Sequence, residues 1–174
     1  MTHRVTATII LMTAMLMDLM DSTITNVALP AISTDLGATP TQLEWTLVGY
    51  VVAFATLLIT GGRLGDIYGR KRIFLVGVIG FTCASVFASL AWSGNALITA
   101  RIIQGAFAGV MVPQVLSSVQ VMYAPEERGP VFGIIGSLNA LGVITGLLLG
   151  GWLVTANLLD RKSTRLNSSH GSAS

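Results

Sequence analysis

The stretch LLITGGRLGDIYGRKRIFLV, residues 57–76, joins two long apolar runs through a short loop with four basic side chains. The two runs extend over residues 43–59 and 73–91, and each is long enough, as a helix, to cross the roughly 30 Å hydrocarbon core of a bilayer. Because lysine and arginine collect in cytoplasmic loops, the connection is expected inside the cell. This part of the chain therefore predicts two membrane-spanning helices joined on the cytoplasmic side.

The whole chain has the composition of a membrane protein. Of its 174 residues, 52% are hydrophobic and 10% are charged, and the mean hydropathy is +0.74, whereas a soluble domain is about 25% charged. Further runs over 5–27, 96–123 and 131–153 give five expected spans without a two-residue alternation. The sequence predicts an all-α transmembrane bundle, in which Pro30 closes the first helix and Pro125 the fourth.

Basic and aromatic residues indicate the orientation of this bundle. Arg4 precedes the first run and Arg128 follows the fourth, so both lie on the same side as the basic loop. The connections over residues 31–42 and 92–95 hold no lysine or arginine. Three tryptophans, which favour membrane interfaces, fall on that second side: Trp45, Trp92 and Trp152. We expect a multi-pass protein of the inner membrane with a cytoplasmic N-terminus.

The last fifteen residues differ abruptly from the rest of the chain. Residues 1–159 hold seven basic and seven acidic side chains, so the net charge of +2 comes from residues 160–174 and does not indicate nucleic-acid binding. Residues 160–170 resemble the in-frame translation of a sequencing-library adapter. A basic tail directly after the fifth run would also lie outside, against the charge rule. We interpret residues 1–159 as an N-terminal transmembrane part and residues 160–174 as a non-native tail, with a native disordered tail as the alternative.

Two carboxylates, Asp18 and Asp21, interrupt the first apolar run one helical turn apart. They share a polar arc with Ser22 and Thr25, and their position argues against a signal-peptide cleavage site. Because an ionised carboxylate is costly at membrane depth, both are expected to face a bundle interior or a water-filled cavity and to titrate as a coupled pair. This arrangement suits a proton carrier. Snorkelling or a lone hydrogen bond between helices is the alternative for each.

The loop between the second and third runs has an ordered pattern of glycine and charge. Its members are Gly62, Gly65, Asp66, Gly69, Arg70 and Lys71. Gly65 and Gly69 permit a tight turn, and Asp66 can cap a helix or pair with a basic neighbour. A loop that only sets topology would explain the charges but not this spacing.

The fourth run contains Arg101 close to its expected outer end, followed by Gln104. Arginine at this depth can snorkel outward. It can also lie beside the carboxylates of the first run, where a proton or a substrate would compete with it.

The fifth run contains glycines at four-residue spacing. They are Gly142, Gly146 and Gly150, with Gly151 adjacent. Such a stripe lets two helix backbones approach closely, and packing alone is a sufficient explanation for it.

In this order the motifs resemble the fourteen-span drug:proton antiporters of the major facilitator superfamily. The stretch DSTITNVALP, residues 21–30, resembles the signature of their first span, and residues 62–72 resemble the loop between their second and third spans. Leu97, Arg101, Gln104 and Gly105 resemble the fourth-span motif. The glycine stripe resembles the antiporter motif, except that Leu147 stands where the family usually has proline. The resemblance implies a proton-coupled multidrug exporter, present here as an N-terminal fragment without the later spans.

The resemblance also implies roles for individual residues. Proton coupling or substrate contact would fall to Asp21, Thr25, Asn26, Arg101 and Gln104, in addition to Asp18 from the polar arc, and the basic loop would form a cytoplasmic gate. The expected partners are the lipid bilayer, protons and small amphipathic or cationic substrates. The driving force would be the proton gradient, and no cofactor, metal or nucleic acid is expected.

Two other functions remain open at this point. Leu147 leaves room for a metabolite facilitator or symporter of the same superfamily. The chain by itself could instead be a non-transporting membrane fragment or a helix-association module, because its polar stripe would lack partner helices. An enzyme is not expected, since the sequence has no metal-ligand cluster, no histidine within an apolar run and no nucleotide-phosphate loop.

Resequencing of the source gene across the codon for Leu159 tests the interpretation of the tail. We expect the native reading frame to continue there into the remaining spans of a fourteen-span protein, and residues 160–174 to be replaced. A native frame that ends directly after Ser174 would contradict this interpretation and, for this molecule, the exporter hypothesis.

Overall fold

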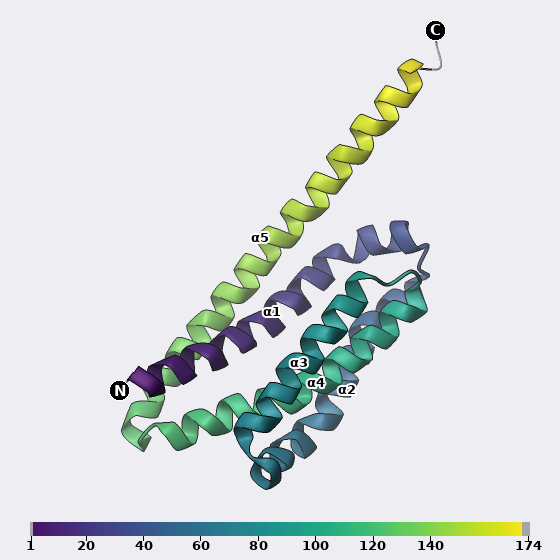
Figure 1. Ribbon diagram of the computed structural model, residues 1–174. Helices are drawn as coiled ribbons and strands as arrows, with labels where there is room; N and C mark the ends of the chain where they lie inside the picture. The colour runs from purple at the N-terminus through teal and green to yellow at the C-terminus, as the bar shows by residue number, and fades with distance from the viewer. Residues whose placement is uncertain (1, 172–174) are drawn as a thin grey trace.

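Each of the five apolar runs lies in a long α-helix in the computed structural model (Figure 1). The structure describes residues 2–171, with the side chains of residues 4–152 and 155. The helices are α1 (Thr2–Leu36), α2 (Pro40–Tyr68), α3 (Arg70–Ser89), α4 (Gly94–Met122) and α5 (Pro125–Gly171). Each contains a stretch long and apolar enough to cross a membrane, which confirms the all-α transmembrane fold. The side chains of residues 160–174 lie outside the described ones, so the interpretation of a non-native tail stays a prediction.

Short connections with specific caps join the helices. Thr39 and Gln42 form a capping box at the start of α2, in which each side chain bonds to the other residue's backbone N–H. At the start of α4, the Ser93 hydroxyl accepts a bond from the backbone N–H of Ala96. Between α2 and α3 the chain turns at Gly69, whose φ of +93° is one that a side chain would strain. These sharp turns reverse the direction of the chain between consecutive helices (Figure 1).

The prediction that Pro30 closes the first helix is wrong, because α1 continues to Leu36 with Pro30 inside it. Proline has no backbone N–H and so frees the carbonyl four residues before it, here that of Asn26, but membrane helices tolerate this loss. The Thr34 hydroxyl donates to the carbonyl oxygen of Pro30 itself over 3.1 Å, one turn further along the continuing helix. Pro113 likewise lies inside α4. Pro125 does separate α4 from α5, since α4 ends at Met122 and Pro125 begins α5.

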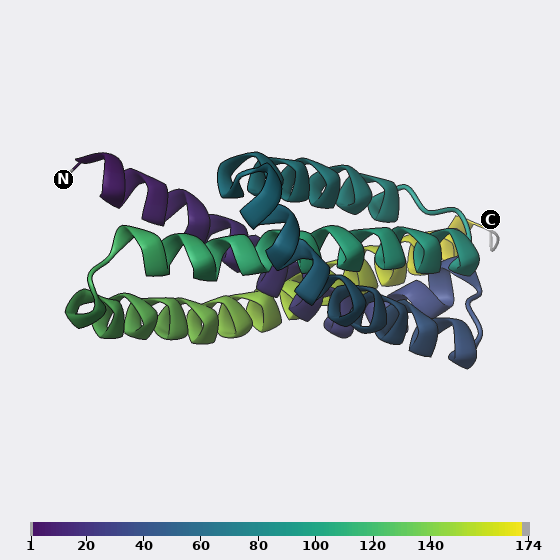
Figure 2. The ribbon, with the colours of Figure 1, turned by 90° about the horizontal axis from the view of Figure 1, so that it is seen from below.

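Helix α4 is the central helix of the bundle and packs along both α2 and α3 (Figures 1 and 2). In the apolar, membrane-length stretch of α4, 44% of the residues are buried, against 17–22% in the same kind of stretch of the other helices. Glycines bring α2 and α4 into backbone contact. A Cβ atom on Gly61 would lie 2.5 Å from the carbonyl oxygen of Gly109, and one on Gly105 would lie 2.2 Å from that of Tyr50. The two helices can therefore pack at this distance only with glycine at these positions.

The glycine stripe of α5 packs against α1, as the spacing predicts. A Cβ atom on Gly146 would lie 2.7 Å from Cβ of Thr23, and one on Gly150 would lie 3.0 Å from Cβ of Val27. Gly142 faces Leu16 in the same way, at 3.1 Å, while Gly151 has open space around its Cα. Three of the four glycines thus hold α1 and α5 close together.

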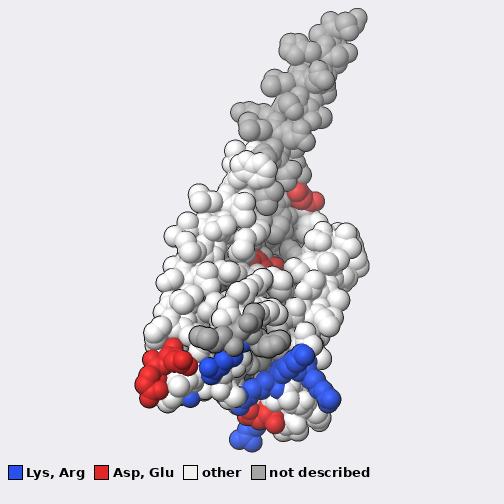
Figure 3. Space-filling model, turned by 60° about the vertical axis from the view of Figure 1, so that its left-hand side comes forward, with Lys and Arg blue, Asp and Glu red and all other residues white. Residues whose placement is uncertain are grey.

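Basic side chains gather at one end of the bundle (Figure 3). The guanidinium of Arg4 lies 5.4 Å from the ring centre of Tyr123, so the N-terminus lies beside the end of α4. Arg128 donates from Nη2 to the carbonyl oxygen of Gln120 over 2.8 Å at this same end. The start of α1, the α2–α3 turn and the α4–α5 turn therefore share one side, as the distribution of charge in the sequence predicts.

Adjacent glycines of α2 provide a matched test of this packing. A Cβ atom on Gly62 has its nearest contact 3.7 Å away, at Cβ of Pro113, whereas one on Gly61 meets backbone. We expect Gly61→Ala to lower the free energy of unfolding by about 1–3 kcal/mol through overpacking. Gly62→Ala should leave it unchanged or raise it slightly, since alanine is the better helix former. The measurement is thermal unfolding in detergent, and equal midpoints for the two variants would contradict the α2–α4 contact.

Candidate functional site

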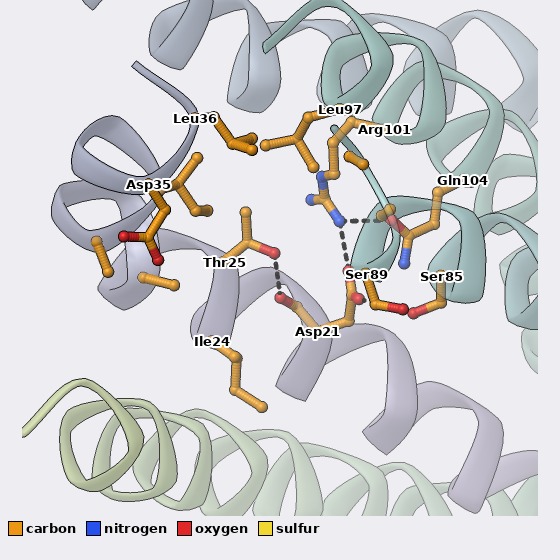
Figure 4. Close-up of a pocket in the computed structure, with 15 residues that line it drawn as sticks. Asp21, Ile24, Thr25, Asp35, Leu36, Ser85, Ser89, Leu97, Arg101 and Gln104 are labelled. Carbon is orange, nitrogen blue, oxygen red and sulfur yellow. Dashed lines mark hydrogen bonds and ion pairs between the residues drawn. The ribbon is translucent and has the colours of Figure 1, made fainter. Parts of the chain in front are cut away.

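A cavity of about 440 Å³ lies between α1, α3 and α4 (Figure 4). Its walls are mostly apolar, but several polar side chains converge on it. They are Asp21, Thr25 and Asp35 of α1, Ser85 and Ser89 of α3, and Arg101 and Gln104 of α4. Predicted site residues from two helices far apart in the sequence therefore meet around one cavity.

The centre of this cluster is an ion pair between Arg101 Nη1 and the carboxylate of Asp21. Arg101 is only 2% exposed, so it does not snorkel to an interface. The same Nη1 donates to Oε1 of Gln104 over 2.8 Å, and the Ser85 hydroxyl donates to Oδ1 of Asp21 over 3.3 Å. Two helices, α3 and α4, thus supply partners to one carboxylate of α1, which is the geometry that a buried pair needs to offset its desolvation.

The second carboxylate of α1 has a different partner. Asp18 accepts a hydrogen bond from the hydroxyl of Tyr50 on α2. The Tyr50 ring also lies beneath the guanidinium of Arg101, with 4.3 Å between the guanidinium carbon and the ring centre. Sequence reasoning missed Tyr50. A tyrosine in the middle of an apolar run was the available signal, because a buried phenol needs a hydrogen-bond partner.

Two donors in this cluster have no partner among the described residues: Nε of Arg101 and Nε2 of Gln104. Both belong to side chains that line the cavity, and Gln104 is fully buried. Buried polar atoms are normally hydrogen-bonded. The cluster can therefore bond further acceptors when water or a solute reaches it.

The remaining predicted site residues of α1 divide between the cavity and the surface. The Thr25 hydroxyl donates to the backbone oxygen of Asp21 over 2.8 Å, and Thr25 lines the cavity. Asn26 is exposed and donates to the backbone oxygen of Ser22 over 2.9 Å. The structure thus groups Asp18, Asp21, Thr25, Arg101 and Gln104, and it places Asn26 apart from them.

The basic loop ties α2 and α3 to α4 at the opposite end of the bundle. Arg70 Nη2 lies 3.2 Å from Oδ1 of Asp66, and Arg70 Nη1 donates to the backbone oxygen of Ser117 over 3.1 Å. Gly65 leaves room for the buried side chain of Gln114, whose Nε2 donates to the backbone oxygen of Gly61 over 2.7 Å. Of the other loop residues, Gly69 forms the turn, Gly62 lies near Pro113 and Lys71 is exposed. The pairing of Asp66 with Arg70 is confirmed, while the role of a gate stays a prediction.

Known proteins match almost the whole chain before the polar tail. Residues 11–158 match the Major Facilitator Superfamily. The probable actinorhodin transporter of Streptomyces coelicolor is 46% identical over 149 residues, which are 86% of this chain and 26% of that protein. The puromycin resistance protein pur8 of Streptomyces alboniger is 39% identical over 146 residues, or 83% of this chain and 29% of that protein.

A third relative is the multidrug export protein EmrB of Haemophilus influenzae, which is 38% identical over 146 residues, or 84% of this chain and 29% of that protein. The chain spans less than a third of the length of these curated relatives. Five membrane-length helices, the four motifs in order and the match over residues 11–158 all agree. The chain belongs to the Major Facilitator Superfamily of membrane transporters.

Proposed function

We propose that the full-length protein is a proton-coupled exporter of small amphipathic or cationic compounds, located in the inner membrane with its N-terminus in the cytoplasm. The observation that carries this proposal is the ion pair of Asp21 and Arg101 at membrane depth beside a cavity. Relatives whose names describe antibiotic resistance or multidrug export support it. Because these names describe resistance and export, they favour an exporter over a metabolite facilitator or symporter.

The ion pair offers a chemical switch for proton coupling. An ionised Asp21 attracts Arg101 strongly, because few water molecules screen a buried pair. When a proton binds the carboxylate, this attraction ends and the helices that carry the two residues, α1 and α4, are free to separate. A cationic substrate competes with Arg101 for the same carboxylate. Inward flow of protons can thus be exchanged for outward movement of substrate at one site.

The cavity suits a small amphipathic ligand. Its volume of about 440 Å³ falls within the usual range for small-molecule sites, about 300–1,000 Å³. Ile24, Ala28 and Leu97 supply apolar walls, and Asp21, Arg101 and Gln104 supply polar groups at one side of the cavity. An apolar surface with a few polar groups binds compounds that carry both features. The proton gradient then supplies the free energy, so the mechanism needs no bound cofactor.

The proposed orientation rests on charge. The basic ends of the described helices share one side of the bundle (Figure 3), and the positive-inside rule assigns this side to the cytoplasm. The cavity extends along α1 from Asp21 to Leu36, away from the basic end. It therefore opens toward the periplasmic side in this state.

Replacement of Asp21 by asparagine tests the proposed coupling. In everted vesicles that contain the full-length protein, we expect Asp21→Asn to reduce substrate transport driven by a proton gradient by more than about tenfold, because the switchable charge is gone. Glu44→Gln is the matched control, since Glu44 is an exposed carboxylate near the start of α2. This control should transport like the native protein. Membrane levels of both variants are compared so that loss of protein is not read as loss of coupling.

Two outcomes would contradict the proposal. If efflux by the native protein persists after the proton gradient is collapsed, transport is not coupled to protons. If Asp21→Asn retains gradient-driven transport at the native rate, the ion pair is not the coupling site.

A further inference from the structure

Tyr50 contacts two groups at the middle of the bundle, the carboxylate of Asp18 and the guanidinium of Arg101. Its hydroxyl donates to Asp18, and its ring lies beneath the guanidinium that pairs with Asp21. Tyr50 is 7% exposed and comes from α2, while the carboxylates belong to α1 and the guanidinium to α4. One side chain therefore links three helices at a polar centre, which consists of Asp18, Asp21, Tyr50 and Arg101.

The two carboxylates differ because of this arrangement. Within the described part of the chain, Asp21 forms an ion pair and Asp18 does not. Asp18 is bonded instead to a neutral phenol. Asp18 can therefore gain or lose a proton without breaking a salt bridge, whereas protonation of Asp21 ends its attraction to Arg101. A coupling device needs some contact that makes these two events depend on each other.

Tyr50 is held firmly enough to provide that contact. Its ring stacks on Phe54, with 6.3 Å between ring centres and an interplanar angle of 9°. Gly105 of α4 also packs directly against the Tyr50 backbone, where a Cβ atom would lie 2.2 Å from the carbonyl oxygen. A cation lying over an aromatic face is attracted to it, and more strongly when both are shielded from water. A shift of the phenol toward or away from Asp18 thus changes the position of Arg101 as well.

We propose that Tyr50 is a positioning residue that couples the protonation of Asp18 to the ion pair of Asp21 and Arg101. The inference rests on the proposed function, because it assigns one step of proton coupling. Ionised Asp18 accepts the hydrogen bond of the phenol. When a proton binds Oδ1 of Asp18, the oxygen that accepts this bond, that oxygen becomes a donor toward the phenol oxygen. The phenol hydroxyl then rotates away and the contact beneath Arg101 changes. The proton leaves again from the same carboxyl oxygen, and Tyr50 keeps its own proton throughout.

The groups that govern the pH response of this centre are few. Asp18 and Asp21 come from α1, Tyr50 from α2 and Arg101 from α4. Helix α3 faces the centre with the uncharged Ser85. The part of α5 that packs on α1 beside this centre, residues 142–150, has no charged or titratable side chain. Changes in pH therefore act here through the two carboxylates.

The chain offers a second tyrosine as a matched control. The Tyr123 hydroxyl lies 2.8 Å from Oγ1 of Thr8 on α1, and Arg4 lies over its ring. Tyr123→Phe therefore removes a hydrogen bond to α1 and leaves a cation over the ring, as Tyr50→Phe does. The difference is that no carboxylate is bonded to Tyr123 among the described residues.

The test is an infrared titration of the full-length protein in lipid bilayers. The absorbance of protonated carboxyl groups is followed against pH, and the signal absent from Asp18→Asn is assigned to Asp18. We expect Tyr50→Phe to displace the midpoint of this signal by about one pH unit, because the ionised carboxylate loses a donor while the ring beneath Arg101 remains. The pH profile of gradient-driven transport should move by a similar amount. Tyr123→Phe should match the native protein in both measurements.

The inference is overturned if Tyr50→Phe and the native protein give superimposable titrations, or if Tyr123→Phe causes the same displacement. These results leave the proposed function intact as long as native transport still requires the proton gradient. Conversely, transport without a gradient defeats the proposed function, whereas the infrared titration still decides whether Tyr50 acts on Asp18.

Discussion

The buried guanidinium of Arg101 is the constraint on which the rest of the bundle depends. A charge at this depth in a bilayer must be met by protein groups, because lipid offers none. Asp21 supplies the countercharge, Gln104 accepts a further bond and the Tyr50 ring lies beneath the guanidinium. These partners come from three helices, so α1, α2 and α4 must converge at one level. The ion pair thus fixes both the register of these helices and the place of the cavity.

Convergence of this kind requires helices that approach closely. Apolar side chains gain little by leaving lipid, so packing in a membrane depends on surface fit. Backbone contacts at Gly61, Gly105 and Gly109 bring α2 against α4, and Gly146 and Gly150 bring α5 against α1. The polar centre lies between these two glycine-packed pairs. Small residues therefore provide the precision that the ion pair needs, although they contribute no charge of their own.

Much of this structure could be predicted from single runs of sequence. Hydropathy predicted the five helices, and the basic residues predicted that the N-terminus and two connections share one end. The cost of buried charge made a carboxylate partner one of two hypotheses for Arg101, beside snorkelling, and the structure shows the ion pair. These features depend on local composition or on a strong energetic penalty. Pro30 was misjudged because proline removes a single backbone donor, and a long membrane helix can continue past that loss, as α1 does to Leu36. Tyr50 was missed because the face that one helix presents to another depends on how the two helices are rotated about their axes. The sequence of a single helix does not show this rotation.

The two faces of α1 have different tasks. At about 100° per residue, Leu16, Thr23 and Val27 lie on the face that meets the α5 glycines, while Asp18, Asp21 and Thr25 lie opposite, on the face of the polar centre. Any movement of α1 caused by protonation on one face must therefore carry α5 with it. Leu147 is 51% exposed and lies beside Gly146, outside this contact. The packing of α5 on α1 thus does not require the proline that the family usually has there, because the glycines alone bring the two backbones together.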